Sequence, residues 1–138
     1  MKKTLFAVML AAIVGLFAIS SCTKSSTSSS IVGKWKIVSA TYTRNGETST
    51  VTYDSAGVSS FMDFQAGGVL VTTTTTVDIS HSITGTYSVT GDTVVISYST
   101  GDSTFVSGTY KIETLQGNNM ILSYSAGEIR TVMTLVRV

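Results

Sequence analysis

The chain contains a single histidine and a single cysteine, the two side chains best suited to nucleophilic or metal chemistry. His81 lies near Asp78 and Ser82, and a serine, a histidine and an aspartate can together activate a hydroxyl group as a nucleophile. That chemistry depends on geometry, and neighbouring residues of a strand point to opposite faces of a sheet. We therefore expect His81 to be an exposed turn residue that neither catalyses a reaction nor binds a metal.

The carboxylates also lack a convergent arrangement. Most of them fall in or beside predicted turns, where such groups are ordinarily solvated: Glu47, Asp54, Asp92, Asp102 and Glu128. Asp63 alternates with Met62 and Phe64 and is expected to face water. The sequence contains no phosphate-binding glycine loop and no metal-ligand spacing. We predict that the protein is not an enzyme and that it has no cofactor and no metal.

Cys22 has a different context, between an apolar segment and a serine-rich stretch. The chain begins with the sequence Met-Lys-Lys, and residues 5–19 carry no charge. This segment has the length of the apolar part of a secretory signal, about 7 to 15 residues, whereas a membrane-spanning helix needs about 20. The following sequence TKSSTSSS, residues 23–30, has no apolar side chain and is typical of a flexible tether.

The sequence ISSC at residues 19–22 resembles the bacterial lipobox. The resemblance implies that diacylglycerol is attached to the thiol of Cys22 and that the chain is cleaved just before this residue. We therefore predict a lipoprotein signal peptide at residues 1–21, a tether at residues 22–30 and a folded domain at residues 31–138. The alternative is an ordinary signal peptide cleaved nearby, with Cys22 as an incidental thiol.

The lone cysteine and its neighbours also bear on partners and location. One thiol cannot form an intramolecular disulfide or a metal site of several thiolates. Acyl chains on Cys22 make a membrane the predicted partner. The next residue is Thr23 rather than the aspartate of many inner-membrane lipoproteins, and the acidic residues that direct some Bacteroidetes lipoproteins to the cell surface are missing. We expect the protein on the outer membrane, at its periplasmic face rather than on the cell surface.

Charge and composition narrow both the function and the fold. Residues 22–138 include seven basic and eight acidic residues, and the basic residues form no stripe, so nucleic acid is not an expected partner. Charged residues make up only 12% of the chain, and proline is absent. Threonine, valine, isoleucine and tyrosine are frequent, as is typical of strands. We predict an all-β fold.

Short alternations of apolar and polar residues, separated by turn signals such as Asn45-Gly46, extend from Gly33 to the C-terminus. They predict nine strands, near residues 34–43, 48–53, 58–64, 69–78, 83–90, 93–99, 104–114, 120–125 and 129–137. Connections this short favour antiparallel pairing of consecutive strands. The predicted fold is an antiparallel up-and-down meander closed into a barrel of eight or nine strands, because closure removes the exposed edges.

An internal repeat supports this prediction. The sequence GTYSVTGDTVVISY at residues 85–98 matches GTYKIETLQGNNMILSY at residues 108–124, which has three extra residues that we place in its turn. A period of two puts four tyrosines on the inward face of the two hairpins: Tyr87, Tyr98, Tyr110 and Tyr124. Because a buried phenol needs a hydrogen-bond partner, these four are the candidate ligand-binding residues of an apolar cavity. The alternative is that each hydroxyl reaches a backbone carbonyl at the rim.

The sequence GKW at residues 33–35, at the start of the first predicted strand, resembles the Gly-x-Trp signature of the lipocalins. With FQAGGV at residues 64–69 and the two GTY hairpins, it makes residues 31–138 similar to the small lipocalin-like lipoproteins of Bacteroidetes. The resemblance implies a lipocalin-like barrel after the signal peptide.

The same resemblance implies roles for a few residues. Gly33 and Trp35 would form the base of the barrel, and either Arg130 or Arg137 would pack over the tryptophan ring. We expect Trp35, together with Ile37, to close one end of the barrel.

Two functions fit this fold. The first is binding of a small apolar or amphipathic ligand inside a lipid-anchored barrel. The alternative is a solid-cored barrel that serves the cell envelope as an interaction or accessory module without a small-molecule ligand. A barrel of about eight strands can either fill its interior with side chains or hold one small ligand, so the predicted fold suits both functions.

Overall fold

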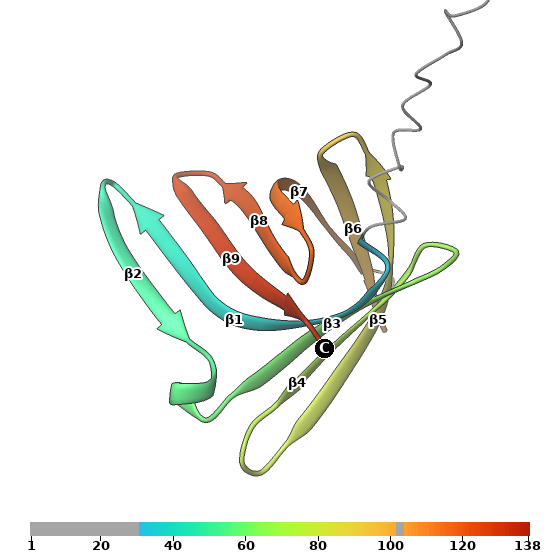
Figure 1. Ribbon diagram of the computed structural model, residues 1–138, viewed down its shortest axis with the longest axis horizontal. Helices are drawn as coiled ribbons and strands as arrows, with labels where there is room; N and C mark the ends of the chain where they lie inside the picture. Colours follow the sequence, from blue (N-terminus) through green and yellow to red (C-terminus); the bar gives the residue numbers. More distant parts are fainter. Residues whose placement is uncertain (1–30, 102–103) are drawn as a thin grey trace, which may run out of the picture.

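The computed structural model describes residues 31–101 and 104–138, and its nine strands follow the chain in the colour order of Figure 1. The strands are β1 (Gly33–Arg44), β2 (Glu47–Thr52), β3 (Ser59–Gln65), β4 (Val69–Thr75), β5 (Ser80–Thr90), β6 (Thr93–Thr100), β7 (Thr104–Gln116), β8 (Asn119–Ala126) and β9 (Ile129–Arg137). A short 3₁₀ helix, η1 (Asp54–Ala56), lies between β2 and β3. All nine predicted strands are present, with ends that differ by three residues or fewer. No helix in the two described ranges is long and apolar enough to cross a membrane.

Eight of the strands close into a barrel. From β3 to β9, each strand pairs with the next, and β1 pairs with β3 on one side and with β9 on the other. Every pairing in the ring is antiparallel. The remaining strand, β2, lies outside the ring. In the described part of the chain it pairs only with β1. The prediction of an all-β, antiparallel barrel closed by eight or nine strands is confirmed.

The strands β2 and β3 do not pair with each other, so the expectation of a simple meander is wrong at this point. Residues 39–44 of β1 pair with β2 and residues 33–37 pair with β3, which places β2 and β3 end to end along one edge of β1. Both strands run antiparallel to β1 and therefore point the same way, so they cannot form a hairpin. The hairpin of β2 with residues 39–44 is called the lip below, and it projects from the barrel at the left of Figure 1.

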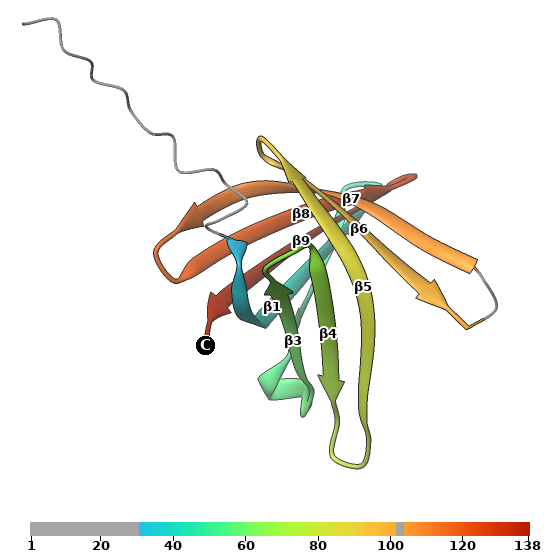
Figure 2. The same cartoon turned by 90° about the vertical axis from the view of Figure 1, so that its right-hand side faces the viewer.

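The turns alternate between two ends of the barrel. The closed end carries the start of β1, the end of β9 and the turns at residues 66–68, 91–92 and 117–118. Backbone hydrogen bonds tie it together, from the amide of Arg137 to the carbonyl of Asn118 (2.9 Å) and from the amide of Val138 to the carbonyl of Lys34 (3.0 Å). The open end carries the lip and the turns at residues 76–79 and 127–128, and the hairpin tips diverge there (Figure 2).

The apolar core gathers in the closed half of the barrel. Its buried side chains are Ile31, Trp35, Ile37, Met62, Phe64, Leu70, Val94, Ile96, Ile112, Met120, Leu122 and Leu135. Burial of apolar area contributes about 25 cal/mol per Å² to folding, so this half supplies most of the stabilisation. The whole described core and all the strands lie within residues 31–138, and a chain of residues 22–138 contains every one of them.

The two copies of the internal repeat both form hairpins, but the three extra residues of the second copy do not lengthen its turn, as we expected. Both hairpins turn in two residues, at residues 91–92 and 117–118, where a glycine supplies the positive φ angle that a tight turn needs. A β-bulge at Glu113 in β7 takes up one extra residue instead. As a result, Tyr124 lies opposite Tyr110 in the second hairpin.

Candidate ligand-binding site

The closed end is built around Trp35, whose side chain is fully buried. Its indole Nε1 donates a hydrogen bond to the carbonyl of Ile31 (2.8 Å). The guanidinium carbon of Arg137 lies 4.3 Å from the centre of the indole ring, and Nη1 of this arginine donates to the carbonyl of Val32 (2.7 Å). The arginine that packs over the tryptophan is therefore Arg137, while Arg130 lies on the outer face of the barrel.

Gly33 leaves the space that Arg137 occupies. Its φ angle is 134°, a conformation that residues with a side chain rarely adopt, and a Cβ atom here would collide with Nη1 of Arg137. Ile37, which is also buried, adds a second apolar layer next to Trp35. The glycine and the tryptophan of the Gly-x-Trp sequence thus act together, the first by admitting the arginine and the second by supplying the ring under it.

Tyr87 belongs to the closed half and lies apart from the other three candidate tyrosines. Its hydroxyl donates to the carbonyl of Gln65 (2.9 Å), and its ring meets the ring of Phe64 edge to face, with centroids 5.0 Å apart. Gln65 ends β3, so this phenol ties β5 to the turn at residues 66–68. Its hydroxyl thus has the rim-carbonyl partner that we considered as the alternative to a ligand.

The structure brings Tyr98, Tyr110 and Tyr124 together in the middle of the barrel, and we call them the tyrosine cluster. The rings of Tyr110 and Tyr124 stack with centroids 5.1 Å apart and planes inclined by 27°. The hydroxyl of Tyr98 shares a hydrogen bond of 2.8 Å with the hydroxyl of Thr72 on β4. The cluster therefore extends from β8 across β7 and β6 to β4.

The glycines of the two GTY sequences make room for these rings. A Cβ atom on Gly85 would lie 2.7 Å from Cδ1 of Tyr98, its cross-strand neighbour, and would collide with the backbone between the two strands. A Cβ atom on Gly108 would lie 3.0 Å from Cε2 of Tyr110. An aromatic ring that covers a glycine in this way protects the exposed backbone and fixes the register of the strands.

The phenols of Tyr98 and Tyr110 remain neutral at physiological pH, because the pKa of each is raised. Burial raises the pKa of Tyr98, and the hydrogen bond with Thr72 offsets part of this effect. Burial also raises the pKa of Tyr110, and the phenols of Tyr98 and Tyr124 raise it further. A phenol that stays protonated can both donate and accept a hydrogen bond, so the cluster can meet either kind of polar group on a ligand.

Strand register aligns the inward-facing residues of the open half in rows that cross β2, β1, β9, β8 and β7. The middle row, which we call the tyrosine row, consists of Ser49, Tyr42, Thr131, Tyr124 and Tyr110. The row nearer the closed end is apolar and consists of Val51, Ala40, Met133, Leu122 and Ile112. The row nearer the open end, the charged row, consists of Glu47, Arg44, Ile129 and Ala126. This wall thus changes from apolar to hydroxylated to charged toward the open end.

A groove of about 750 Å³ lies on the inner side of the lip. Its lining residues are Tyr42, Arg44, Asn45, Glu47, Thr48, Ser49 and Ile129. Most of them belong to the tyrosine row or the charged row, so the groove and the tyrosine cluster lie on one continuous wall. Its volume falls in the range of small-molecule sites, about 300 to 1,000 Å³.

Sequence reasoning missed the contribution of the lip, above all Tyr42 and Arg44. A β-bulge at Val38 shifts the register of β1 against β9 and reverses the alternation of side chains beyond it. A period of two counted from Trp35 would turn Thr41 inward, whereas Thr41 faces outward and contacts a threonine of β2 through its hydroxyl. No glycine or turn signal in the sequence marks this bulge.

His81 lies in β5 and not in a turn, so that expectation is wrong. The amide of Thr76 donates to the carbonyl of Ile79 (2.8 Å) and closes a tight turn, after which β5 begins at Ser80. The side chain of His81 is exposed. The hydroxyl of Ser82 points to the other face of the sheet, where it contacts a threonine of β4 (2.8 Å), so the serine and the histidine do not converge.

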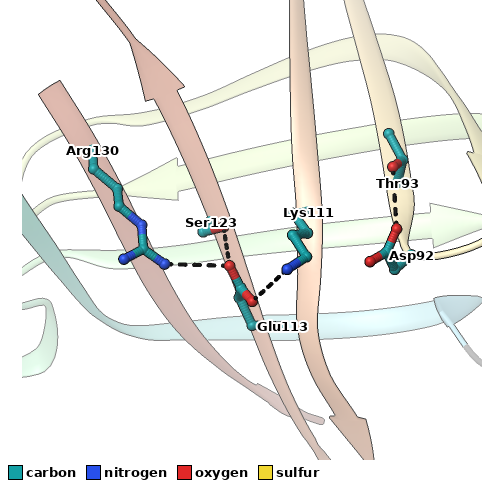
Figure 3. A network of polar contacts seen from close by, with 6 residues as sticks. All are labelled: Asp92, Thr93, Lys111, Glu113, Ser123 and Arg130. Atoms are coloured by element: carbon teal, nitrogen blue, oxygen red, sulfur yellow. Dashed lines mark hydrogen bonds and ion pairs between the residues drawn. The ribbon is translucent and has the colours of Figure 1, made fainter. Parts of the chain in front are cut away.

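A polar network covers the outer face of β7, β8 and β9, away from the groove (Figure 3). The carboxylate of Glu113 accepts a hydrogen bond from the hydroxyl of Ser123 (2.7 Å) and forms ion pairs with Lys111 (3.2 Å) and Arg130 (3.3 Å). The Ser123 hydrogen bond, followed by that of Lys111, lowers the pKa of Glu113. Because Glu113 is the bulge residue of β7, the network joins the three strands at the point where their register shifts.

The remaining candidate groups add no second site. Within residues 31–101 and 104–138, no group of three or more histidine, cysteine, aspartate or glutamate side chains could hold a metal ion. Cys22, the predicted lipid attachment site, and Asp102 lie outside the described residues.

Comparison with known proteins agrees with the geometry of the barrel. Residues 31–133 match the family of lipocalin-like domains. A lipocalin-like protein from Bacteroides uniformis ATCC 8492 is similar in structure, with a TM-score of 0.52 and 18% identity over 75% of this chain and 96% of that protein. An uncharacterized protein from Bacteroides eggerthii DSM 20697 has a TM-score of 0.50 and 18% identity over 75% of this chain and 97% of its own. Among proteins with curated descriptions, none matches the chain.

At this level of identity the two structures show a shared fold. The family match carries more weight, because it extends from the first described residue into β9 and covers most of the chain. This protein belongs to the family of lipocalin-like domains, whose members are generally binding proteins rather than enzymes.

Proposed function

We propose that this protein is a lipid-anchored lipoprotein of the cell envelope whose barrel binds one small apolar or amphipathic molecule at its open end. The observation that carries the binding role is the tyrosine row, which leads from the groove on the lip to Tyr124 and Tyr110. Small-molecule sites are concave and mostly apolar, with a few polar groups that orient the ligand. The apolar row and the phenol hydroxyls supply these two kinds of contact.

The division of the barrel into two halves supports the same proposal. The closed half is filled by the core and by the base at Trp35, which leaves the open half as the way in. There the wall opposite the lip is also polar, because Tyr98 and Thr72 share a hydrogen bond and Ser60 contacts Thr74 (3.1 Å). These hydroxyls can exchange their mutual hydrogen bonds for bonds to a ligand. In a solid-cored interaction module, by contrast, apolar side chains would fill the open half as they fill the closed half.

Titration with N-phenyl-1-naphthylamine tests the binding role, because this uncharged dye becomes fluorescent in an apolar site. We expect the non-acylated mature chain, residues 22–138, to bind the dye saturably at one molecule per barrel, with emission shifted to the blue. The groove has the volume of a small-molecule site, and Tyr42 and Ile129 offer apolar surface to the dye. A weak signal that rises linearly with dye concentration would favour the solid-cored module instead.

The anchor is the second half of the proposal. The lipobox-like sequence before Cys22 supports acylation of this thiol, and buried acyl chains contribute about 0.8 kcal/mol per methylene to membrane binding. Ile31 packs at the closed end, where its carbonyl accepts the hydrogen bond from Trp35. A tether at residues 22–30 would therefore join the barrel at its closed end and leave the open end accessible. We place the protein on the outer membrane, facing the periplasm.

Substitution of Cys22 by alanine is expected to abolish acylation and to release the protein from the membrane fraction or leave it unprocessed. The thiol is the acceptor of the diacylglycerol group, and the chain has no second cysteine. Intact mass of the wild-type protein should show a mature chain that begins at Cys22 and carries acyl chains. A wild-type mass with a free thiol and no acyl chains would exclude the anchor. Digestion of the barrel by protease added to intact cells would contradict the periplasmic location.

A further inference from the structure

The charged row at the open end contains two opposite charges that form no ion pair with any described residue. Arg44 is the one cation, and Glu47 the one anion, among the described residues that line the groove. They form the last cross-strand pair of the lip before its turn. No ion pair or side-chain hydrogen bond joins either of them to another described residue. The planar guanidinium of Arg44 therefore has free donors in the geometry that binds a carboxylate, sulfonate or phosphate group.

Part of the surface next to Arg44 is apolar. Tyr42 and Ile129 adjoin it on the wall of the groove and keep about two-fifths of their surface exposed, at 40% and 39%. Large apolar side chains left open beside an arginine suit a ligand that is itself part apolar and part charged. The order of the rows sets the orientation of such a ligand. Its apolar part would face the apolar row toward the closed end, and its charged group would lie at the charged row on the rim.

The depth of the wall limits the size of the ligand. Four residues along β1 separate Arg44 in the charged row from Ala40 in the apolar row, and a strand rises about 3.3 Å per residue, so the wall is roughly 13 Å deep. The tyrosine row between them ends in the stacked rings of Tyr124 and Tyr110. Aromatic rings of this kind favour stacked or edge contacts with another ring. The site therefore suits a body of two or three rings better than a long extended chain.

We infer that the ligand is an anionic amphiphile of two or three rings, which lies along the tyrosine row and places its acidic group against Arg44. This inference rests on the proposed binding function and specifies its ligand class. Glu47, on the opposite strand of the lip, has the same sign of charge as the ligand. It therefore weakens binding of an anion and restricts the site to ligands whose acidic group reaches the guanidinium.

Two dyes that differ by one group test this inference on the mature chain, residues 22–138. 1-Anilinonaphthalene-8-sulfonate carries a sulfonate that N-phenyl-1-naphthylamine lacks, and the two are otherwise the same molecule. We expect Arg44→Ala to weaken binding of the sulfonate about five- to tenfold, the scale of one partly exposed charge-assisted contact, and to change binding of the uncharged dye less than about twofold. Glu47→Gln should strengthen binding of the sulfonate and leave that of the uncharged dye unchanged.

Arg130→Ala provides the matched control, because it removes the same charge from the outer face of the barrel. It should leave the affinity for both dyes unchanged. The inference is overturned if Arg44→Ala weakens the binding of both dyes equally or of neither dye. It is also overturned if Arg130→Ala changes dye binding as much as Arg44→Ala does. Failure of the uncharged dye to bind the wild type would refute the proposed function itself, whereas saturable binding of that dye with no role for Arg44 would refute only the ligand class.

Discussion

Replacement of Trp35 by alanine is expected to lower the free energy of unfolding by about 3 to 5 kcal/mol, the range found when large buried aromatic residues are truncated. The indole is fully buried at the closed end, and no exposed part of it could be lost at low cost. Its removal would also leave the carbonyl of Ile31 without its donor and the guanidinium of Arg137 without the ring beneath it. Three kinds of contact are therefore lost at once, and all of them belong to the base of the barrel.

Urea unfolding followed by circular dichroism measures this loss, since Trp35 is the only tryptophan and its variant has no indole fluorescence. Val95→Ala is a suitable control, because Val95 lies on the outer face of β6 and is 36% exposed. The free energy of unfolding of this control variant should fall by less than about 1 kcal/mol. In the wild type, indole emission should be shifted to the blue and resist aqueous quenchers. A loss in Trp35→Ala as small as in the control would show that the closed end does not depend on this ring.

The strands could be predicted from sequence because the signals for them are local. Alternation of apolar and polar residues marks the strands, and glycines next to asparagine or aspartate mark the turns, so β6 and β9 were located almost to the residue. The base could also be anticipated, but only from the resemblance of Gly33-Lys34-Trp35 to the Gly-x-Trp signature of the lipocalins. The choice between Arg130 and Arg137 could not be made from sequence. It depends on the pairing of β9 with β1, which is a contact between the two ends of the domain.

The bulges could not be predicted, and they decide which side chains face inward. One extra residue at Val38 turns Tyr42 toward the groove, and another at Glu113 sets Tyr124 opposite Tyr110. Neither position carries a glycine, and each bulge is defined only by the register of its partner strand. The end-to-end arrangement of β2 and β3 escaped prediction for the same reason, because it depends on how two separate segments share one edge of β1.

For the four tyrosines of the repeat, the sequence predicted the face of the sheet but not the position along the barrel. The repeat correctly grouped them by face, but strand tilt and register determine their height in the barrel. Tyr87 lies at the level of the turn after β3 and binds a carbonyl there, whereas Tyr98, Tyr110 and Tyr124 meet in the middle. The role of these three in ligand binding stays a prediction, and the space beside Tyr124 is where it can be tested.

Thr131→Trp is expected to block that space. Thr131 stands at the centre of the tyrosine row, opposite Tyr42 on one side and Tyr124 on the other, so an indole at this position would cover the wall between the groove and the tyrosine cluster. Thr109→Trp is the matched control, because Thr109 is an exposed residue on the outer face of β7. We expect the first variant to bind N-phenyl-1-naphthylamine at least about tenfold more weakly, a loss of about 1.4 kcal/mol or more, and the second to bind it like the wild type.

Titration of this dye into the wild type and the two tryptophan variants is therefore the most direct measurement of binding at the open end. Thermal unfolding followed by circular dichroism should first establish that all three proteins are folded at the titration temperature. The predicted result is saturation at one dye molecule per barrel in the wild type and in Thr109→Trp, with weak or no binding in Thr131→Trp. Equal affinity in all three proteins, or saturation in none of them, would contradict a ligand site on the tyrosine row.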